Sequence, residues 1–139
     1  MPIHVFSDDW ASRCADVLNS NQAYREAAAA WEGALVLLMV SERTPGAAWR
    51  VYLDLWHGEC RLARSAQEED EALARYVLTG TVDSWQLVLT GKVAPLLAVM
   101  TGRLRLAKGS LTELIPFVNA AKELVAAATA VEAEFPEGA

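Results

Sequence analysis

Residues 89–110 constrain the fold of this chain more than any other stretch, because they contain several boundaries between structural elements. Gly91 and Gly102 each follow an apolar segment, and Pro95 begins the segment between them. Proline suits the first turn of a helix, where no amide hydrogen is needed. Glycine suits the position after a helix, where the backbone often adopts a positive φ. The stretch therefore predicts a helix that ends near Gly91 and a short apolar helix that begins at Pro95.

The same stretch leads into a strand and then a long helix. Arg103 to Ala107 alternates between charged and apolar residues, as a half-buried strand does. Ser110 and Glu113 have the spacing of a capping box, so we expect a helix from Ser110 to about Ala133. Pro116 lacks an amide hydrogen and should bend this helix.

Capping residues predict three earlier helices. Ser7, Asn21 and Thr81 can each accept a hydrogen bond at a helix start. They predict helices that run to about Asn19, Trp31 and Leu89 respectively.

The strands are predicted from two different patterns. Residues 34–40 are apolar at every position, which is typical of a central strand covered on both faces. Residues 49–56 alternate, His57-Gly58 indicates a hairpin turn, and 60–62 and 75–79 complete the set. The acidic residues 67–71 indicate a solvated loop. Mixed strands and helices in this order predict an α+β fold.

Composition favours one domain over residues 1–139, with an apolar surplus. The chain is 53% hydrophobic, above the roughly 45–50% of ordinary domains. The apolar run of seven residues at Ala34–Val40 is far shorter than the roughly 18 needed to span a membrane. Polar residues near the N-terminus argue against a signal peptide, so we expect a cytoplasmic protein. A net charge of −6 disfavours a nucleic-acid partner.

No combination of residues predicts catalysis. His4 and His57 lie in the expected N-terminal segment and hairpin turn, and neither has partners that indicate a base or a metal ligand. Cys14 and Cys60 lack the spacing of a metal or redox motif, so we expect small buried thiols, with a disulfide as the alternative. The sequence predicts no enzyme, no metal site and no cofactor.

The last helix carries more apolar residues than a core-facing stripe requires. A bound apolar ligand or a second subunit would each cover the surplus, and alanines could instead fill the space themselves. Trp85 is equally compatible with the core and with a cavity wall, whereas the other four tryptophans favour core packing. Basic residues at 92, 103, 105 and 108 fit an edge strand better than a contact to a lipid headgroup or carboxylate.

The chain resembles the sterol carrier protein 2 family, most strongly from Tyr76 to Val125. The resemblance rests on Thr79-Gly80, Trp85, Gly91-Lys92, Pro95, Gly102-Arg-Leu-Arg-Leu106 and Gly109. It is closest to the small stand-alone bacterial members. It implies a five-stranded twisted, mainly antiparallel sheet with helices packed on it and a long C-terminal helix, enclosing an apolar cavity. The family usually has an acidic residue before the proline, where this chain has Ala94, so a local cap should be missing.

The resemblance also implies a function and a site. We expect non-catalytic binding or transfer of a fatty acid, acyl-CoA or sterol- or isoprenoid-like lipid, without stable membrane insertion. The alternatives are an interaction or dimerisation module, including a homodimer, and an accessory protein that presents a lipid to a partner enzyme. By analogy with the family, the cavity would be lined by Trp85, Leu89, Leu97, Met100, Leu104, Leu106, Leu114, Ile115 and Val118.

Overall fold

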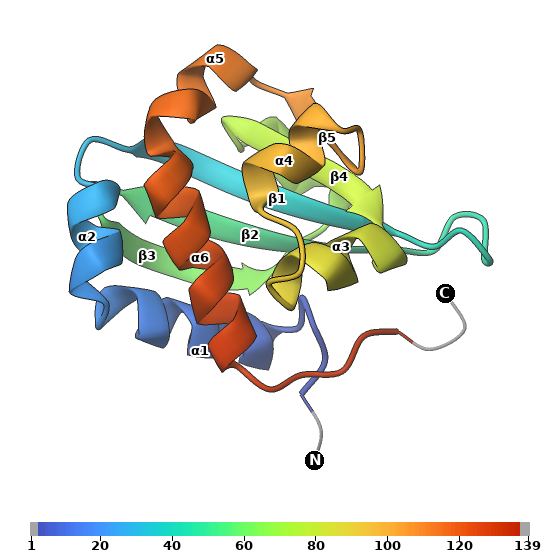
Figure 1. Ribbon diagram of the computed structural model, residues 1–139. Helices are drawn as coiled ribbons and strands as arrows, with labels where there is room; N and C mark the ends of the chain where they lie inside the picture. The colour runs from blue at the N-terminus through green and yellow to red at the C-terminus, as the bar shows by residue number, and fades with distance from the viewer. Residues whose placement is uncertain (1–2, 137–139) are drawn as a thin grey trace.

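A computed structural model describes residues 3–136 and contains one five-stranded sheet (Figure 1). The strand order is β3-β2-β1-β4-β5; β1 and β4 are parallel, and the other three neighbouring pairs are antiparallel. The predicted mainly antiparallel sheet is thereby confirmed. The elements are α1 (Asp8–Asn19), α2 (Gln22–Ala27), β1 (Glu32–Val40), β2 (Ala48–Trp56), β3 (Glu59–Ser65), the 3-10 helix η1 (Glu68–Ala72), β4 (Tyr76–Thr81), α3 (Val82–Leu89), α4 (Pro95–Met100), β5 (Leu104–Lys108), α5 (Leu111–Leu114), the 3-10 helix η2 (Ile115–Phe117) and α6 (Val118–Ala130).

Strand β1 is the centre of the sheet, as its continuous apolar sequence predicts. It pairs with β2 on one side and β4 on the other, and it is buried on both faces. Leu35, Leu37 and Met39 belong to the main core, whereas Val36 packs with Val77 and Ala74 in a small cluster of its own. The large core therefore lies on one side of the sheet only.

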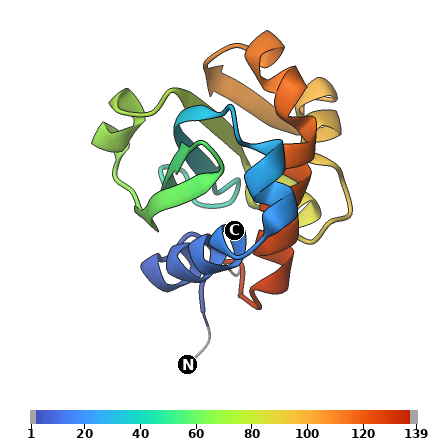
Figure 2. The same cartoon turned by 90° about the vertical axis from the view of Figure 1, so that its left-hand side faces the viewer.

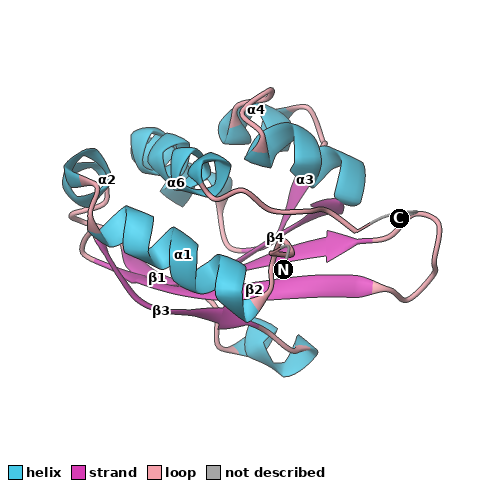
Figure 3. Cartoon of the chain, turned by 90° about the horizontal axis from the view of Figure 1, so that it is seen from below, coloured by secondary structure: helices cyan, strands magenta, loops and turns pink. Residues whose placement is uncertain are grey.

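The helices cover one face of the sheet in a single layer (Figure 3). The opposite face carries η1, seen on the far side of the sheet from α2 and α6 in Figure 2. Residues 67–71, predicted as a solvated loop, are ordered instead: Arg64 binds Asp70 at 2.9 Å and Arg50 binds Glu71 at 2.7 Å. These ion pairs to β2 and β3 hold η1 in place, while Gln67, Glu68 and Glu69 are exposed, as the acidic composition predicted.

Three of the predicted helix starts are confirmed by their capping bonds. The side chains of Ser7, Asn21 and Thr81 accept from the amides of Trp10, Tyr24 and Ser84. Helix α2 ends at Ala27, earlier than the predicted Trp31. The indole of Trp31 donates to the carbonyl of Gly33 at 2.9 Å, which fixes Trp31 to the start of β1.

The predicted C-terminal helix is broken rather than bent. Pro116 lies within η2, which separates the short α5 from the long α6. The predicted capping box is wrong, because Ser110 makes no side-chain cap. Glu113 instead accepts from Arg75 at 2.7 Å and from the Tyr76 hydroxyl at 2.6 Å. Glu113 thus makes two charge-assisted hydrogen bonds to residues outside the helix, in place of the predicted bond to the start of its own helix.

Gly109, between β5 and α5, packs closely against a neighbouring aromatic ring. It has φ of +102°, and an added Cβ would collide with the buried ring of Tyr76, whereas Gly102 has φ of +81° and open space around it. Gly102→Ala should cost about 1 kcal/mol, the usual cost of a side chain at positive φ. Gly109→Ala should cost clearly more in urea unfolding, because it adds the collision. Equal losses for the two variants would contradict the packing described here.

Candidate ligand-binding cavity

An apolar cavity of about 130 Å³ lies between the sheet and the helix layer. Its floor comes from β1, β2, β4 and β5, and its walls come from all six α-helices. No charged side chain lines it. The lining residues are Trp10, Cys14, Leu18, Tyr24, Ala28, Trp31, Leu35, Leu37, Leu53, Leu55, Leu78, Trp85, Val88, Leu89, Pro95, Leu96, Val99, Leu104, Leu111, Leu114, Phe117, Val118, Ala120, Ala121, Leu124, Val125 and Ala128.

The alanines of α6 leave this space open. Ala120, Ala121 and Ala128 face the cavity, where larger side chains would fill it. Protein interiors are normally packed to the density of organic crystals, so an empty volume of this size is unusual. A cavity of about 150 Å³ with a comparable apolar lining binds benzene. The space is therefore large enough for a ring or a short stretch of hydrocarbon.

Five of the nine residues expected at the site line the cavity: Trp85, Leu89, Leu104, Leu114 and Val118. The other four do not. Leu97, Met100 and Ile115 are 52%, 68% and 51% exposed, and Leu106 is half-buried outside the lining. Helix α4 turns Leu96 and Val99 inward, so Leu97 and Met100, three residues apart, share its outer face.

The expectation from sequence omitted the walls from the N-terminal half of the chain. Trp10, Cys14 and Leu18 follow each other at four-residue intervals on α1 and line the cavity, as do Leu53 and Leu55 on β2. The periodicity that places these residues inside was visible. It indicates burial, however, and does not distinguish a packed core from the wall of a cavity.

Comparison with known proteins identifies the family of this chain. Residues 15–113 match the SCP-2 sterol transfer family. The chain belongs to this family. A crystal structure of a sterol carrier protein 2 has 41% identity and a TM-score of 0.82, covering 92% of this chain and 99% of its own. A Thermus thermophilus protein, described as possibly a sterol carrier protein, has 40% identity and a TM-score of 0.84, covering 95% and 92%.

A more distant structure shares the fold. Sterol carrier protein 2 from Yarrowia lipolytica, in its apo form, has 21% identity and a TM-score of 0.58, covering 85% of this chain and 88% of its own. No curated protein matched the chain. Membership of the SCP-2 family supports a role in lipid binding or transfer in general terms.

The departure from the SCP-2 family pattern at Ala94 has the expected local effect. Ala94 is the N-cap of α4 and makes no side-chain bond, while Pro95 occupies the first turn. Helix α4 therefore forms one wall of the cavity with an uncapped start.

Two tryptophans are fixed at the cavity by their indole nitrogens. Trp85 donates to the carbonyl of Leu38 at 2.8 Å, so it is both a core residue and a cavity wall. Trp31 packs edge-on against Phe117 and lies 5.0 Å from the ring of Tyr76. Trp49 is half-buried against the core, whereas Trp56 is 38% exposed beside Arg61.

Glu113 ties α5 to the beginning of β4. The hydrogen bond from Tyr76, and then that from Arg75, hold the pKa of Glu113 below its ordinary value. Burial and the bond to Glu113 raise the pKa of Tyr76 to about 12. Since Leu111, Leu114 and Phe117 line the cavity, this pair of bonds holds one of its walls in place.

The cysteines are buried, and the basic residues lie outside the cavity lining. Cys14 and Cys60 are free and buried, as expected, and burial raises their pKa values to about 12 and about 11. Arg103 and Arg105 are exposed beside or on β5, which is an edge strand, and Lys108 donates to the carbonyls of Glu71 and Ala72. None of these basic residues lines the cavity.

Two kinds of feature are absent from residues 3–136. No helix there is long and apolar enough to cross a membrane. No group of three or more His, Cys, Asp or Glu side chains in that range has the arrangement of a metal site.

The role of Glu113 predicts a pH dependence. Its pKa is lowered in the folded state, so its contribution to stability is present above the unfolded value of about 4.3 and is lost as the pH falls through the folded value. Urea unfolding at pH 7 should show Glu113→Gln less stable than the wild type. The difference should shrink as the pH is lowered below about 4.3. Glu42→Gln, at an exposed turn, is the control, and an equal pH dependence for both variants would contradict the assignment.

Proposed function

We propose that this chain binds and carries a hydrophobic lipid, such as a fatty acid, an acyl-CoA or a sterol- or isoprenoid-like molecule, without chemical change. The observation that carries the proposal is a cavity of about 130 Å³ lined without a charged side chain, in a chain of the SCP-2 sterol transfer family. Burial of hydrocarbon supplies the affinity, at about 0.8 kcal/mol per methylene before the costs of ordering.

The size of the cavity limits what it can hold without rearrangement. Its volume is close to that of the benzene-binding cavity of about 150 Å³, so a long acyl chain requires the helix layer to move away from the sheet. Binding of such a ligand is therefore coupled to a displacement of the cavity walls. The ligand-contacting residues that we propose are the five expected ones that line the cavity, Trp85, Leu89, Leu104, Leu114 and Val118, together with the walls from α1 and β2.

The lining also argues against catalysis in the cavity. Its potential nucleophile is the thiol of Cys14, and burial raises the pKa of that thiol to about 12. A thiol that stays protonated at neutral pH is a weak nucleophile. No carboxylate or histidine lines the cavity to activate it. We therefore propose a carrier, acting alone or presenting its lipid to a partner enzyme.

A pair of neighbouring residues allows a matched test. Leu114 lines the cavity, whereas Ile115 is exposed outside it. Leu114→Arg should weaken the binding of hexadecanol, an uncharged probe, by about tenfold or more, because it places an unpaired charge in an apolar space. Ile115→Arg should leave binding close to that of the wild type. Native mass spectrometry of detergent-free protein with added hexadecanol measures both, with circular dichroism to verify folding.

The result has clear consequences for the proposal. Wild-type protein that takes up no palmitate, sterol or isoprenoid alcohol would contradict lipid carriage. A folded Leu114→Arg variant that binds as well as the wild type would contradict the assignment of this cavity as the site.

A second candidate function is self-association. Leu97 and Met100, on the outer face of α4, and Ile115, in η2, expose apolar surface that a second copy could cover. Exposed apolar patches commonly mark interaction sites.

Light scattering distinguishes a dimer from a monomer. In a homodimer the measured mass should rise with concentration, and Met100→Ser should lower it. Leu73→Ser, at a residue that is also 68% exposed, is the matched control. A monomer mass that is independent of concentration would contradict this second function.

A further inference from the structure

Two polar atoms in the cavity walls have no hydrogen-bond partner among residues 3–136. The indole nitrogen of Trp10, on α1, makes no hydrogen bond in this part of the chain, and neither does the hydroxyl oxygen of Tyr24, on α2. Their residues are only 3% and 2% exposed. Both line the cavity.

The other buried aromatic polar groups are all satisfied. The indoles of Trp31 and Trp85 donate to the backbone, and the hydroxyl of Tyr76 donates to Glu113. Buried polar groups are nearly always paired, so the two exceptions call for an explanation. Leaving such a group buried without a partner costs about 1–3 kcal/mol.

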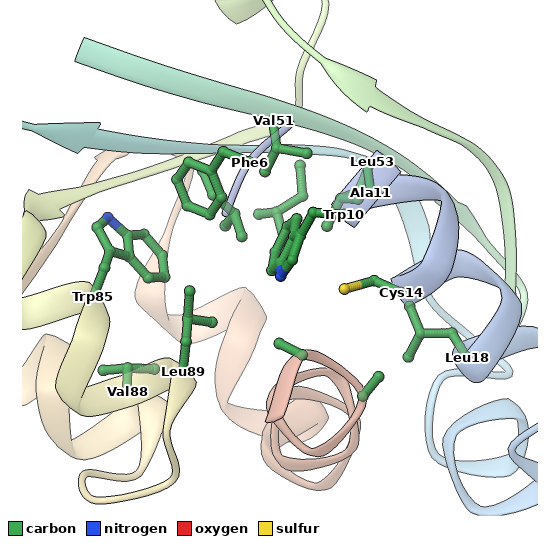
Figure 4. Close-up of a cluster of buried hydrophobic side chains, with 14 of the residues drawn as sticks. Phe6, Trp10, Ala11, Cys14, Leu18, Val51, Leu53, Trp85, Val88 and Leu89 are labelled. Atoms are coloured by element: carbon green, nitrogen blue, oxygen red, sulfur yellow. The ribbon is translucent and has the colours of Figure 1, made fainter. Parts of the chain in front are cut away.

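The two unpaired atoms face open space rather than packed neighbours. Within the described residues, no side-chain nitrogen or oxygen is both sealed from water-sized molecules and unpaired. The nitrogen of Trp10 and the oxygen of Tyr24 therefore each border accessible space, and both residues line the cavity. Figure 4 shows the ring nitrogen of Trp10 and the sulfur of Cys14 directed into the region between α1, α3 and α6.

The two residues lie on the same side of the cavity. Helices α1 and α2 follow each other in the chain and contact each other. Burial raises the pKa of the Tyr24 hydroxyl above its ordinary value, so the group remains a hydrogen-bond donor at neutral pH. An indole nitrogen is a donor only. This side of the cavity thus offers two donors in an otherwise apolar lining.

The absence of charge in the lining decides which ligand group fits these donors. None of the lining residues is Lys, Arg or His, so a carboxylate drawn inside would have no opposite charge. Burying an unpaired carboxylate is far more costly than burying a neutral group. A hydroxyl, ketone or ester carbonyl can accept one or both hydrogen bonds without that cost.

We propose that Trp10 and Tyr24 anchor the polar group of an uncharged lipid, which this cavity prefers to an ionised fatty acid of the same chain length. The inference rests on the proposed function, because it concerns the ligand class of the same cavity. It makes α1 and α2 the polar end of the site, and the α3 and α4 side the hydrocarbon end.

Three twelve-carbon probes test the preference. Dodecanol, dodecanoate and dodecane are each equilibrated at pH 7.5 between the protein and a cyclodextrin carrier, and the bound amounts are measured by gas chromatography. Wild-type protein should take up dodecanol in preference to dodecane, once the known affinity of the carrier for each is taken into account. It should take up dodecanoate less well than dodecanol.

Variants separate the anchor from the volume of the cavity. Tyr24→Phe removes only the hydroxyl and should lower the dodecanol-to-dodecane affinity ratio by about three- to tenfold, the value of one hydrogen bond. Trp10→Phe should lower the same ratio. Its smaller ring weakens apolar contacts with both probes, so the comparison with dodecane corrects for the lost ring volume. Tyr52→Phe removes a hydroxyl from a residue that packs against the small cluster on the other face of the sheet, and it should leave the ratio unchanged.

A stability measurement provides a readout that does not need a ligand. In the absence of lipid, Tyr24→Phe should unfold at the same urea concentration as the wild type or a higher one, because its hydroxyl has no bond to lose. Tyr76→Phe should unfold at a lower concentration. A clear loss of stability in Tyr24→Phe would show that its hydroxyl is already paired and would overturn the anchor.

The outcomes distinguish the two proposals. If none of the three probes binds, the proposed lipid function fails and the anchor fails with it. If dodecane and dodecanol bind but both variants keep the wild-type ratio, the lipid function stands and the anchor is overturned. Preferential binding of dodecanoate at pH 7.5 would also overturn it.

Discussion

The burial of β1 on both faces is the constraint on which the rest of the structure depends. A strand with no polar face must pair on both sides, and β1 does so with β2 and β4. It must also be covered above and below. On one face Val36 packs in a small cluster with Ala74 and Val77, and η1 on that face is held by ion pairs to Arg50 and Arg64. The main core lies on the other face, under the helix layer, where the cavity forms.

The cavity results from a mismatch in side-chain size between two helices of that layer, α1 and α6. Helix α1 contributes large side chains such as Trp10 and Leu18, whereas α6 contributes Ala120, Ala121 and Ala128. Large residues facing large ones would separate the helices, and small residues on both sides would let them collapse together. Here the sheet and the capped helices hold the spacing while the alanines leave it unfilled. The empty volume costs stability, since cavities forfeit packing contacts, and a bound apolar molecule would restore those contacts.

Signals between residues close in the sequence correctly predicted the features that depend only on such neighbours. The caps at Ser7, Asn21 and Thr81 depend on residues three positions away and were correct. The box at Ser110 and Glu113 has the same local pattern but failed, because Tyr76 and Arg75 compete for the carboxylate across 37 and 38 positions. The predictions for the cavity walls also divide into a part that local signals decide and a part that they do not. Composition indicated that 95–100 is apolar, but which face of so short a helix turns inward depends on packing partners that no local pattern contains.

The hydrogen bonds of the walls identify where the cavity can enlarge at least cost. Helix α1 is bonded to β3 through Asn19 and Cys60, α3 to β1 through Trp85, and α6 to α3 through Thr129. Within residues 3–136, the hydrogen bonds of α4 are local to the helix and its flanking residues. Moving α4 outward therefore breaks apolar contacts but no hydrogen bond to another element. A ligand longer than the present cavity, with its polar group held near α1 and α2, would extend its hydrocarbon towards the wall that is easiest to displace.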